Sequence, residues 1–158
     1  MKKIDSFGLD LCKMQGALFV ASKNLASGSA VFIRRFMHSE VAERMDNGTI
    51  AFSSDNQESL LKEIEKEYND HPYGKEKYAD EELYWIGYIY RYWSYCYEKS
   101  SKSIYKVSGA KEMRNLYYPY HSLDPLMAIG RILESKEKPA QDSIEEGVKI
   151  LRKIIKNN

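Results

Sequence analysis

The sequence has few of the residues and patterns that mark several large protein classes. Its 158 residues include two cysteines, four prolines and nine glycines, which excludes disulfide scaffolds and collagen-like chains. No run approaches the roughly 18 apolar residues that a membrane-spanning helix needs. The formal net charge is +1, so the overall charge gives no reason to expect a nucleic-acid partner. Cys12 and Cys96 are far apart and form no C-x-x-C pair, and we expect reduced core thiols in a cytoplasmic protein.

Motifs for common cofactors and common catalytic chemistry are also missing. The three histidines, His38, His71 and His121, lie on three different segments, and no pair of them has metal-binding spacing. The glycine-rich loops that bind phosphates are absent, as is the G-x-S-x-G turn of common hydrolases. We therefore expect no metal and no cofactor. An enzyme of a common nucleotide-dependent or hydrolase type is not predicted.

The most distinctive feature that is present is a block of tyrosines. All 13 lie between Tyr68 and Tyr120 together with both tryptophans, whereas all five phenylalanines precede the block. This aromatic content excludes low-complexity disorder. Charge is segregated as well: residues 55–82 carry ten acidic and four basic side chains, and residues 83–158 carry 13 basic and eight acidic ones. The acidic segment is either a solvated helix face followed by a loop or a surface that engages a basic partner.

Apolar side chains recur every three or four residues, which predicts helices through most of the chain. In residues 80–105 apolar and aromatic side chains cover nearly the whole circumference, which is typical of a buried helix. Gly87 and Ser94 share one stripe of it, where small side chains let another helix approach closely. We expect residues 1–158 to form one all-α domain, a helical bundle around this Tyr/Trp-rich central helix. The other expected helices span residues 4–25, 30–46, 56–68, 108–117, 125–134 and 143–156, with loops at 69–79 and 135–142.

Proline and capping residues define several of these boundaries. Pro119 is expected to end the helix 108–117. Asp124 and Pro125 start the next helix, because Asp caps a free N–H group and Pro lacks one. Residues 48–54 are the single candidate strand, and one strand makes no sheet. The last helix carries an apolar stripe that either closes the core or pairs with a second copy as a homodimer; the stripe consists of Ile144, Val148, Leu151 and Ile155.

Three roles are open for the tyrosine block: packing in the core, contact with a protein partner, or stacking of nucleic-acid bases. Most of these tyrosines fall on the buried arc of the central helix. Those in loops or at helix ends are freer to face solvent. With one arginine they form the predicted partner-binding set: Tyr73, Tyr78, Arg114, Tyr117, Tyr118 and Tyr120. A nucleic-acid binder would use Arg34 and Arg35 with the basic side of the same block.

One short spacing points to a catalytic alternative. Arg114 is followed by a polar residue and, seven positions on, by His121, which resembles the R-x4–6-H motif of HEPN ribonucleases. In that family the motif lies at a helix of a small all-helical domain. The resemblance implies that His121 would transfer protons while Arg114 steadied the phosphate. The sequence departs from the pattern at Pro119, which would break the presenting helix. The other interpretation is a surface arginine and a histidine in a turn.

Residues 39–46, 84–93 and 121–130 together resemble a group of small bacterial proteins encoded in toxin–antitoxin-like or immunity-like gene pairs. The resemblance implies a helical protein that binds and silences a neighbouring toxin, with ADP-ribosyltransferase-type toxins among the candidates. It implies no catalytic residue. We therefore expect a non-catalytic protein-binding module, with the HEPN-like ribonuclease and the nucleic-acid binder as alternatives.

Overall fold

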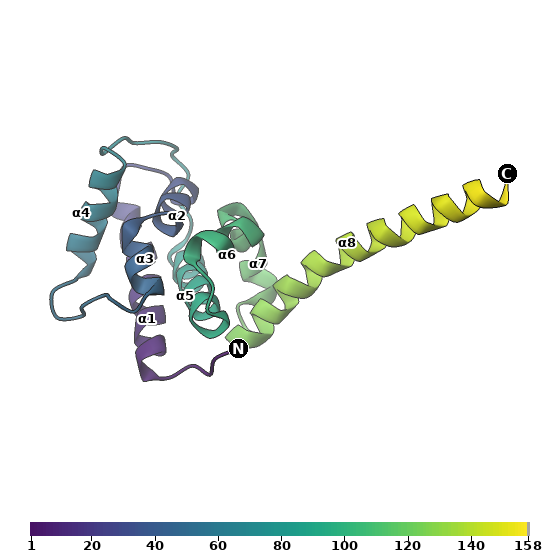
Figure 1. Ribbon diagram of the computed structural model, residues 1–158. Coiled ribbons are helices and arrows are strands. Elements are labelled where there is room, and N and C mark those ends of the chain that lie inside the picture. The colour runs from purple at the N-terminus through teal and green to yellow at the C-terminus, as the bar shows by residue number, and fades with distance from the viewer. Residues whose placement is uncertain (158) are drawn as a thin grey trace.

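The computed structural model describes residues 1–157, with the backbone alone for residues 139–142. This part of the chain holds eight α-helices, one short 3-10 helix (Ser22–Asn24) and no strand (Figure 1). The all-α prediction is confirmed, and residues 48–54 form no strand. Among the described helices, none combines the length and apolar character that crossing a bilayer requires. The helices are α1 (Ser6–Ala21), α2 (Ser29–Met37), α3 (Glu40–Asp46), α4 (Gln57–Glu67), α5 (Asp80–Tyr97), α6 (Ser101–Val107), α7 (Ala110–Tyr120) and α8 (Pro125–Lys156).

The packing of α5 along α1 is the most extensive helix–helix contact in the described chain. Gly87 of α5 makes this approach close. A Cβ at Gly87 would lie 2.8 Å from the carbonyl oxygen of Gln15 and 2.9 Å from the ring of Phe19. Gly16 of α1 is similarly tight, because its Cβ would lie 3.1 Å from the carbonyl oxygen of Tyr84. The predicted close approach at Gly87 is therefore confirmed, and α1 is the helix that uses it.

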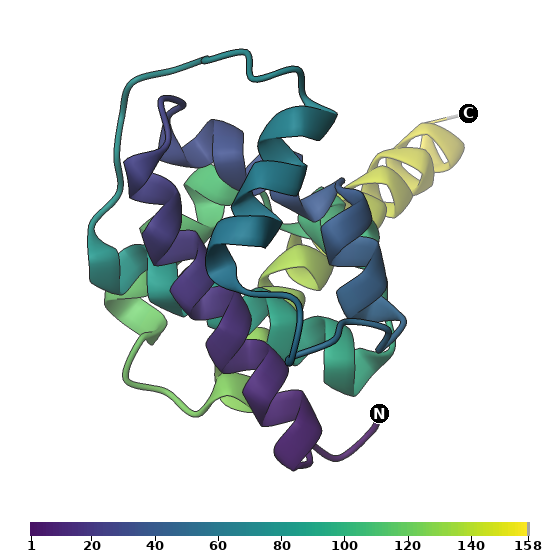
Figure 2. The same cartoon turned by 90° about the vertical axis from the view of Figure 1, so that its left-hand side faces the viewer.

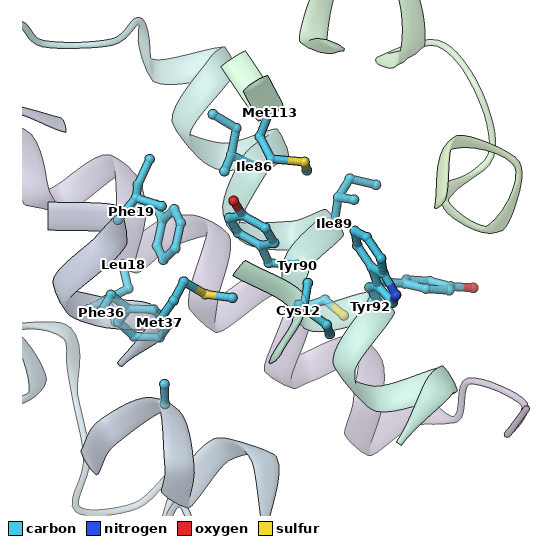
Figure 3. Packing of buried hydrophobic residues seen from close by; sticks show 14 of the residues in the cluster. Cys12, Leu18, Phe19, Phe36, Met37, Ile86, Ile89, Tyr90, Tyr92 and Met113 are labelled. Carbon is cyan, nitrogen blue, oxygen red and sulfur yellow. The ribbon is translucent and has the colours of Figure 1, made fainter. Parts of the chain in front are cut away.

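Apolar side chains from several helices fill the core around this pair (Figure 3). Phe19 of α1 packs edge-on against Phe32 and Phe36 of α2, with ring centroids 5.7 and 5.0 Å away. Cys12 and Cys96 are free and buried, as predicted. Most of α5 is buried, and its accessible tyrosines are Tyr84, which is exposed, and Tyr88, Tyr95 and Tyr97, which are half-buried.

The expected helix 30–46 is two helices. It breaks after Met37 because the Ser39 hydroxyl donates to the carbonyl of Phe36 at 2.7 Å. The same oxygen accepts from the N–H of Ala42 at 3.2 Å and so caps α3. One serine thereby closes the end of α2 and starts α3 in a new direction.

The expected central helix 80–105 is also divided. The α5 helix ends at Tyr97, because Glu98 takes the left-handed conformation with φ of 52°. Ser100 then caps α6 by accepting from the N–H of Ser103 at 3.1 Å. The central helix is therefore shorter than predicted, and its continuation turns away as α6.

The C-terminal part of the chain is more helical than predicted. Pro119 lies in the last turn of α7, where its missing N–H removes a single hydrogen bond. Asp124 caps α8 as predicted, and α8 then runs to Lys156 without the loop expected at 135–142. Lysine and glutamate dominate residues 134–138, and both are good helix formers. The polar composition of this stretch is that of a solvated helix.

The segment between α4 and α5 is the predicted loop, and it runs along the outside of the bundle (Figure 2). Hydrogen bonds tie it to the start of α2. The N–H of Gly28 donates to the carbonyl of Tyr73 at 2.9 Å, and the Ser29 hydroxyl accepts from the N–H of Tyr78 at 2.9 Å. The ammonium of Lys77 donates to two carbonyls, those of Leu25 and Ser27. This loop is therefore held in place along its second half.

A buried arginine links four helices. Arg91 of α5 donates from Nη1 to Asp46 Oδ1 of α3 at 2.7 Å. It also donates from Nε to Gln15 Oε1 of α1 at 2.7 Å, and from Nη2 to Ser101 Oγ of α6 at 2.9 Å. Asp46 also accepts from the N–H of Ser101 at 2.8 Å. Burial lowers the pKa of Arg91, and the adjacent Asp46 carboxylate opposes that shift.

Candidate functional site

The predicted partner-binding residues do not form a single surface. Sequence reasoning grouped them because they lie in loops or at helix ends. The fold distributes them over three places on the bundle. Tyr73 lines one hollow, Arg114 covers the ring of Tyr78 and pairs with two glutamates, and Tyr117 lines a second hollow with Tyr118 beside it. Tyr120 is half-buried and packs against the core.

Tyr78 is only 2% exposed, so the expectation that it faces solvent is wrong. The guanidinium of Arg114 covers its ring at 4.3 Å. Two carboxylates hold that guanidinium: Nε lies 3.2 Å from Glu82 Oε2, and Nη1 pairs with Glu76. Burial raises the pKa of Tyr78. The charge of Arg114 is therefore already balanced within the protein, and its side chain acts as a lid on a core tyrosine.

The second hollow, which we call the aromatic hollow, has a volume of about 680 Å³. Tyr117 connects the α5 side of the hollow with the end of α7. Its ring packs edge-on against Trp85, with centroids 5.9 Å apart, and stacks on His121, with centroids 4.6 Å apart. Tyr84 and Tyr88, one turn apart on α5, stack at 6.0 Å. The apolar lining is completed by Val20, Ile89, Leu123 and Pro125. Tyr118, 84% exposed, lies just outside beside His121.

The charges around the aromatic hollow are mostly negative. Asp80 and Glu81, in the first turn of α5, line it and are exposed. Lys23 pairs with Asp80 at 2.8 Å and offsets part of that charge. Burial raises the pKa of Tyr92, and the nearby Asp124 carboxylate raises it further. Asp124 lies between the lining residues Leu123 and Pro125 and adds a carboxylate on the α8 side, so a cationic group is favoured in this hollow.

The first hollow, which we call the basic hollow, has a volume of about 920 Å³ and the opposite charge. The guanidinium of Arg35 lies 5.2 Å from the ring centroid of Tyr68 and donates to Ser27 Oγ at 3.2 Å. His38 meets Tyr105 edge-on at 5.3 Å. Other lining residues include Arg34, Tyr73, Lys111 and Glu112, of which Glu112 pairs with Lys136.

Arg114 and His121, the two residues of the ribonuclease hypothesis, line different hollows. No hydrogen bond joins them among the described residues. The Nδ1 atom of His121 lies 3.0 Å from the carbonyl oxygens of Tyr117 and Tyr118, whereas Arg114 is held by two glutamates. In the part of the chain that the structure describes, no cluster of three metal-ligating side chains occurs.

Sequence reasoning missed the α5 side of the aromatic hollow. Tyr84, Trp85 and Tyr88 fall on the arc of the helix that the apolar pattern assigns to the core. Whether such a ring faces solvent depends on which helices cover that arc: Trp85 is buried, Tyr88 is half-buried and Tyr84 is exposed. Asp80 and Glu81, the acidic first turn just before these rings, were a usable signal for a rim with negative charge.

Searches for related proteins gave no match: no family model matches the chain, and no curated protein or solved structure is detectably similar to it.

Proposed function

We propose that the protein is a non-catalytic protein-binding module of the antitoxin or immunity type, which silences a partner toxin by direct binding. The observation that carries this proposal is the aromatic hollow. It presents the rings of Tyr84, Tyr88 and Tyr117 beside apolar side chains on an accessible face of the bundle. Tyrosine and tryptophan supply rigid contact area at protein interfaces, and they dominate the residues that carry binding energy there.

The acidic rim specifies the chemistry of the partner. Asp80 and Glu81 line the hollow beside the rings and Asp124 adjoins its lining residues Leu123 and Pro125, so a lysine or arginine of the partner gains both charge attraction and contact with a tyrosine face. An apolar residue beside that cation would fill the space lined by Val20 and Leu123. The occupant is therefore a basic, partly apolar segment of a partner protein, and a toxin of ADP-ribosyltransferase type is one candidate to carry it.

Co-expression with the product of the neighbouring gene tests this proposal. The wild-type chain should copurify with that product and suppress its toxicity. Glu81→Lys should weaken both effects strongly, because it places a positive charge where the partner's cation binds. The matched control is Glu43→Lys on α3, an exposed residue outside the aromatic hollow that undergoes the same charge change.

A second pair of variants tests which of the two hollows binds the partner. Tyr84→Ala removes a ring from the aromatic hollow, whereas Tyr73→Ala removes an exposed ring from the basic hollow. Only the first should reduce copurification. Equal effects of both variants, or wild-type chain that neither copurifies with the neighbouring product nor changes its toxicity, would contradict the proposal.

The basic hollow favours a second candidate function, binding of single-stranded nucleic acid. Arg34, Arg35 and Lys111 can pair with phosphates while Tyr73 and Tyr105 stack bases. A fluorescently labelled RNA oligonucleotide should then bind with an affinity that falls steeply as salt rises. Loss of this binding in Arg34→Ala would support it, and salt-independent binding would contradict it. The same RNA tests the ribonuclease alternative, which requires cleavage that His121→Ala abolishes.

A further inference from the structure

The α8 helix leaves the bundle after its first turns. Ala128, Ile129 and Ile132 are fully buried, and α5 packs against this part of the helix. Farther along, α8 extends away from every other element (Figure 1). All side chains that the structure describes from residue 134 to residue 157 are exposed. We call residues 143–157 the C-terminal arm.

The arm is amphipathic, and its apolar side has no cover in the described chain. Six of its side chains are large and apolar and are 40–74% exposed: Ile144, Val148, Ile150, Leu151, Ile154 and Ile155. A helix of this length is marginal in water when alone, because most helical stability comes from packing an apolar face. We therefore expect the apolar side of the arm to pack against another helix.

The spacing of the apolar residues indicates which helix that is. Ile144, Val148, Leu151 and Ile155 are separated by four, three and four positions, the d-a-d-a spacing of a coiled coil. The series reads the same in both directions. Two antiparallel copies would therefore match a and d layers, with Ile144 against Ile155 of the second copy and Val148 against Leu151 of the second copy.

The charges select the antiparallel arrangement. Glu145 and Arg152 both occupy e positions, which face each other across an antiparallel pair, so each carboxylate meets the guanidinium of the other chain. A parallel pair would instead bring the basic ends of both arms together; they carry Arg152, Lys153 and Lys156. A parallel pair would also place the two helical bundles side by side at the same end of the coiled coil. Gly147 and Ile154 both occupy g positions, which face each other across an antiparallel pair, and the glycine has no side chain to crowd the isoleucine of the second copy.

We infer that the C-terminal arm binds the arm of a second copy of this chain as a short antiparallel coiled coil across a twofold axis. The axis passes between residues 149 and 150. At a rise of about 1.5 Å per residue, the buried start of α8 lies roughly 25 Å from the axis in each copy. The two bodies are then roughly 50 Å apart, on opposite ends of the coil. Ile150 lies on the outer side of this seam and stays exposed. This surface is separate from the aromatic hollow.

Sedimentation of the full-length chain over a range of concentrations tests the pairing. The mass should rise from 18.4 kDa toward twice that value, with a dissociation constant in the micromolar range because the seam spans only two heptads. Leu151→Asp should keep the chain monomeric at every concentration. Its side chain is exposed in the monomer, so the thermal unfolding of the body should not change.

Charge reversal tests the antiparallel register. Glu145→Lys and Arg152→Glu should each weaken self-association at least tenfold, because each places like charges at both e-position pairs. An equimolar mixture of these two variants should form heterodimers, since both pairs are then opposite in charge. Glu146→Lys is the matched control, because position 146 faces outward and the same charge change should have a much smaller effect.

Two results would overturn the inference. A wild-type chain that stays monomeric at the highest concentration, or a Leu151→Asp variant that dimerises as well as wild type, would show that the arm does not pair with a second copy. In that case the apolar side of the arm would bind a different protein. Failure of the two charge-reversal variants to associate with each other would overturn the antiparallel register.

Discussion

Replacing Asp46 by alanine should destabilise the fold more than any exposed substitution. Asp46 is the carboxylate that balances the buried guanidinium of Arg91, at 2.7 Å. The Arg91 side chain is 1% exposed and that of Asp46 is 14% exposed. The variant therefore leaves a full positive charge in the core without its counterion. It also removes the acceptor for the N–H of Ser101, at 2.8 Å, at the start of α6.

The magnitude follows from this burial. Breaking a buried ion pair by removing one partner typically costs about 3–5 kcal/mol. Because Asp46 retains some contact with water, we expect a value near the lower end, about 3 kcal/mol. Total unfolding free energies of domains are about 5–15 kcal/mol, so the variant should remain folded but lose a large share of its stability. The melting temperature should fall by roughly 6–12 °C for a chain of this size.

Urea unfolding of the variant, followed by tryptophan fluorescence and far-ultraviolet circular dichroism, measures the loss directly. The double variant Asp46→Ala/Arg91→Met is the control. It removes both charges and keeps an apolar side chain in the core, so it should recover part of the stability lost in Asp46→Ala. A loss below about 1 kcal/mol in Asp46→Ala, or no recovery in the double variant, would refute the argument that uncompensated charge dominates.

The remaining predictions concern packing, backbone strain and thiol chemistry. Gly87→Ala should cost about 1–3 kcal/mol in urea unfolding, because its Cβ would lie 2.8 Å from a backbone oxygen of α1. Gly130→Ala is its control and should be neutral or stabilising, since nothing lies within 4 Å of the added Cβ. Glu98→Gly should raise stability by up to about 1 kcal/mol, because φ is 52° there; a clear loss in the same assay would contradict this. Burial raises the pKa of Cys12 to about 12. Ellman's reagent at pH 8 should therefore modify Cys12 and the equally buried Cys96 slowly until urea unfolds the chain, whereas rapid labelling of the native protein would contradict their burial.

Local patterns predicted the helices well and their interruptions poorly. The apolar spacing and the cap at Asp124 are short-range features, so the sequence alone was enough for them. The break at Glu98 has no comparable signal, because glutamate rarely adopts positive φ and the fold imposes it there. The polar composition of residues 135–142 predicts a loop, whereas α8 continues through them, and the lysines and glutamates of residues 135–138 are good helix formers.

The candidate site depended on long-range contacts that no local pattern contains. Tyr78 is buried because Lys77 and Ser29 hold its loop against α2, about 50 residues away in the sequence. Arg91 shares a stripe with Gly87, and the partners of its guanidinium come from three other helices. The sequence therefore predicts the residue types of the candidate site but groups them on one surface, whereas the fold distributes them over several.

The pairing of α1 with α5 has a consequence for how the chain is made. Gln15 and Arg91, which join the two helices, are 76 residues apart. Synthesis proceeds from the N-terminus at about 5–20 residues per second, so α1 waits roughly 4–15 s for its partner. During that interval the apolar face of α1, which includes Leu11, Leu18 and Phe19, has only α2–α4 to cover it. A nascent chain of this protein should therefore present a chaperone-binding helix until residue 97 has emerged from the ribosome.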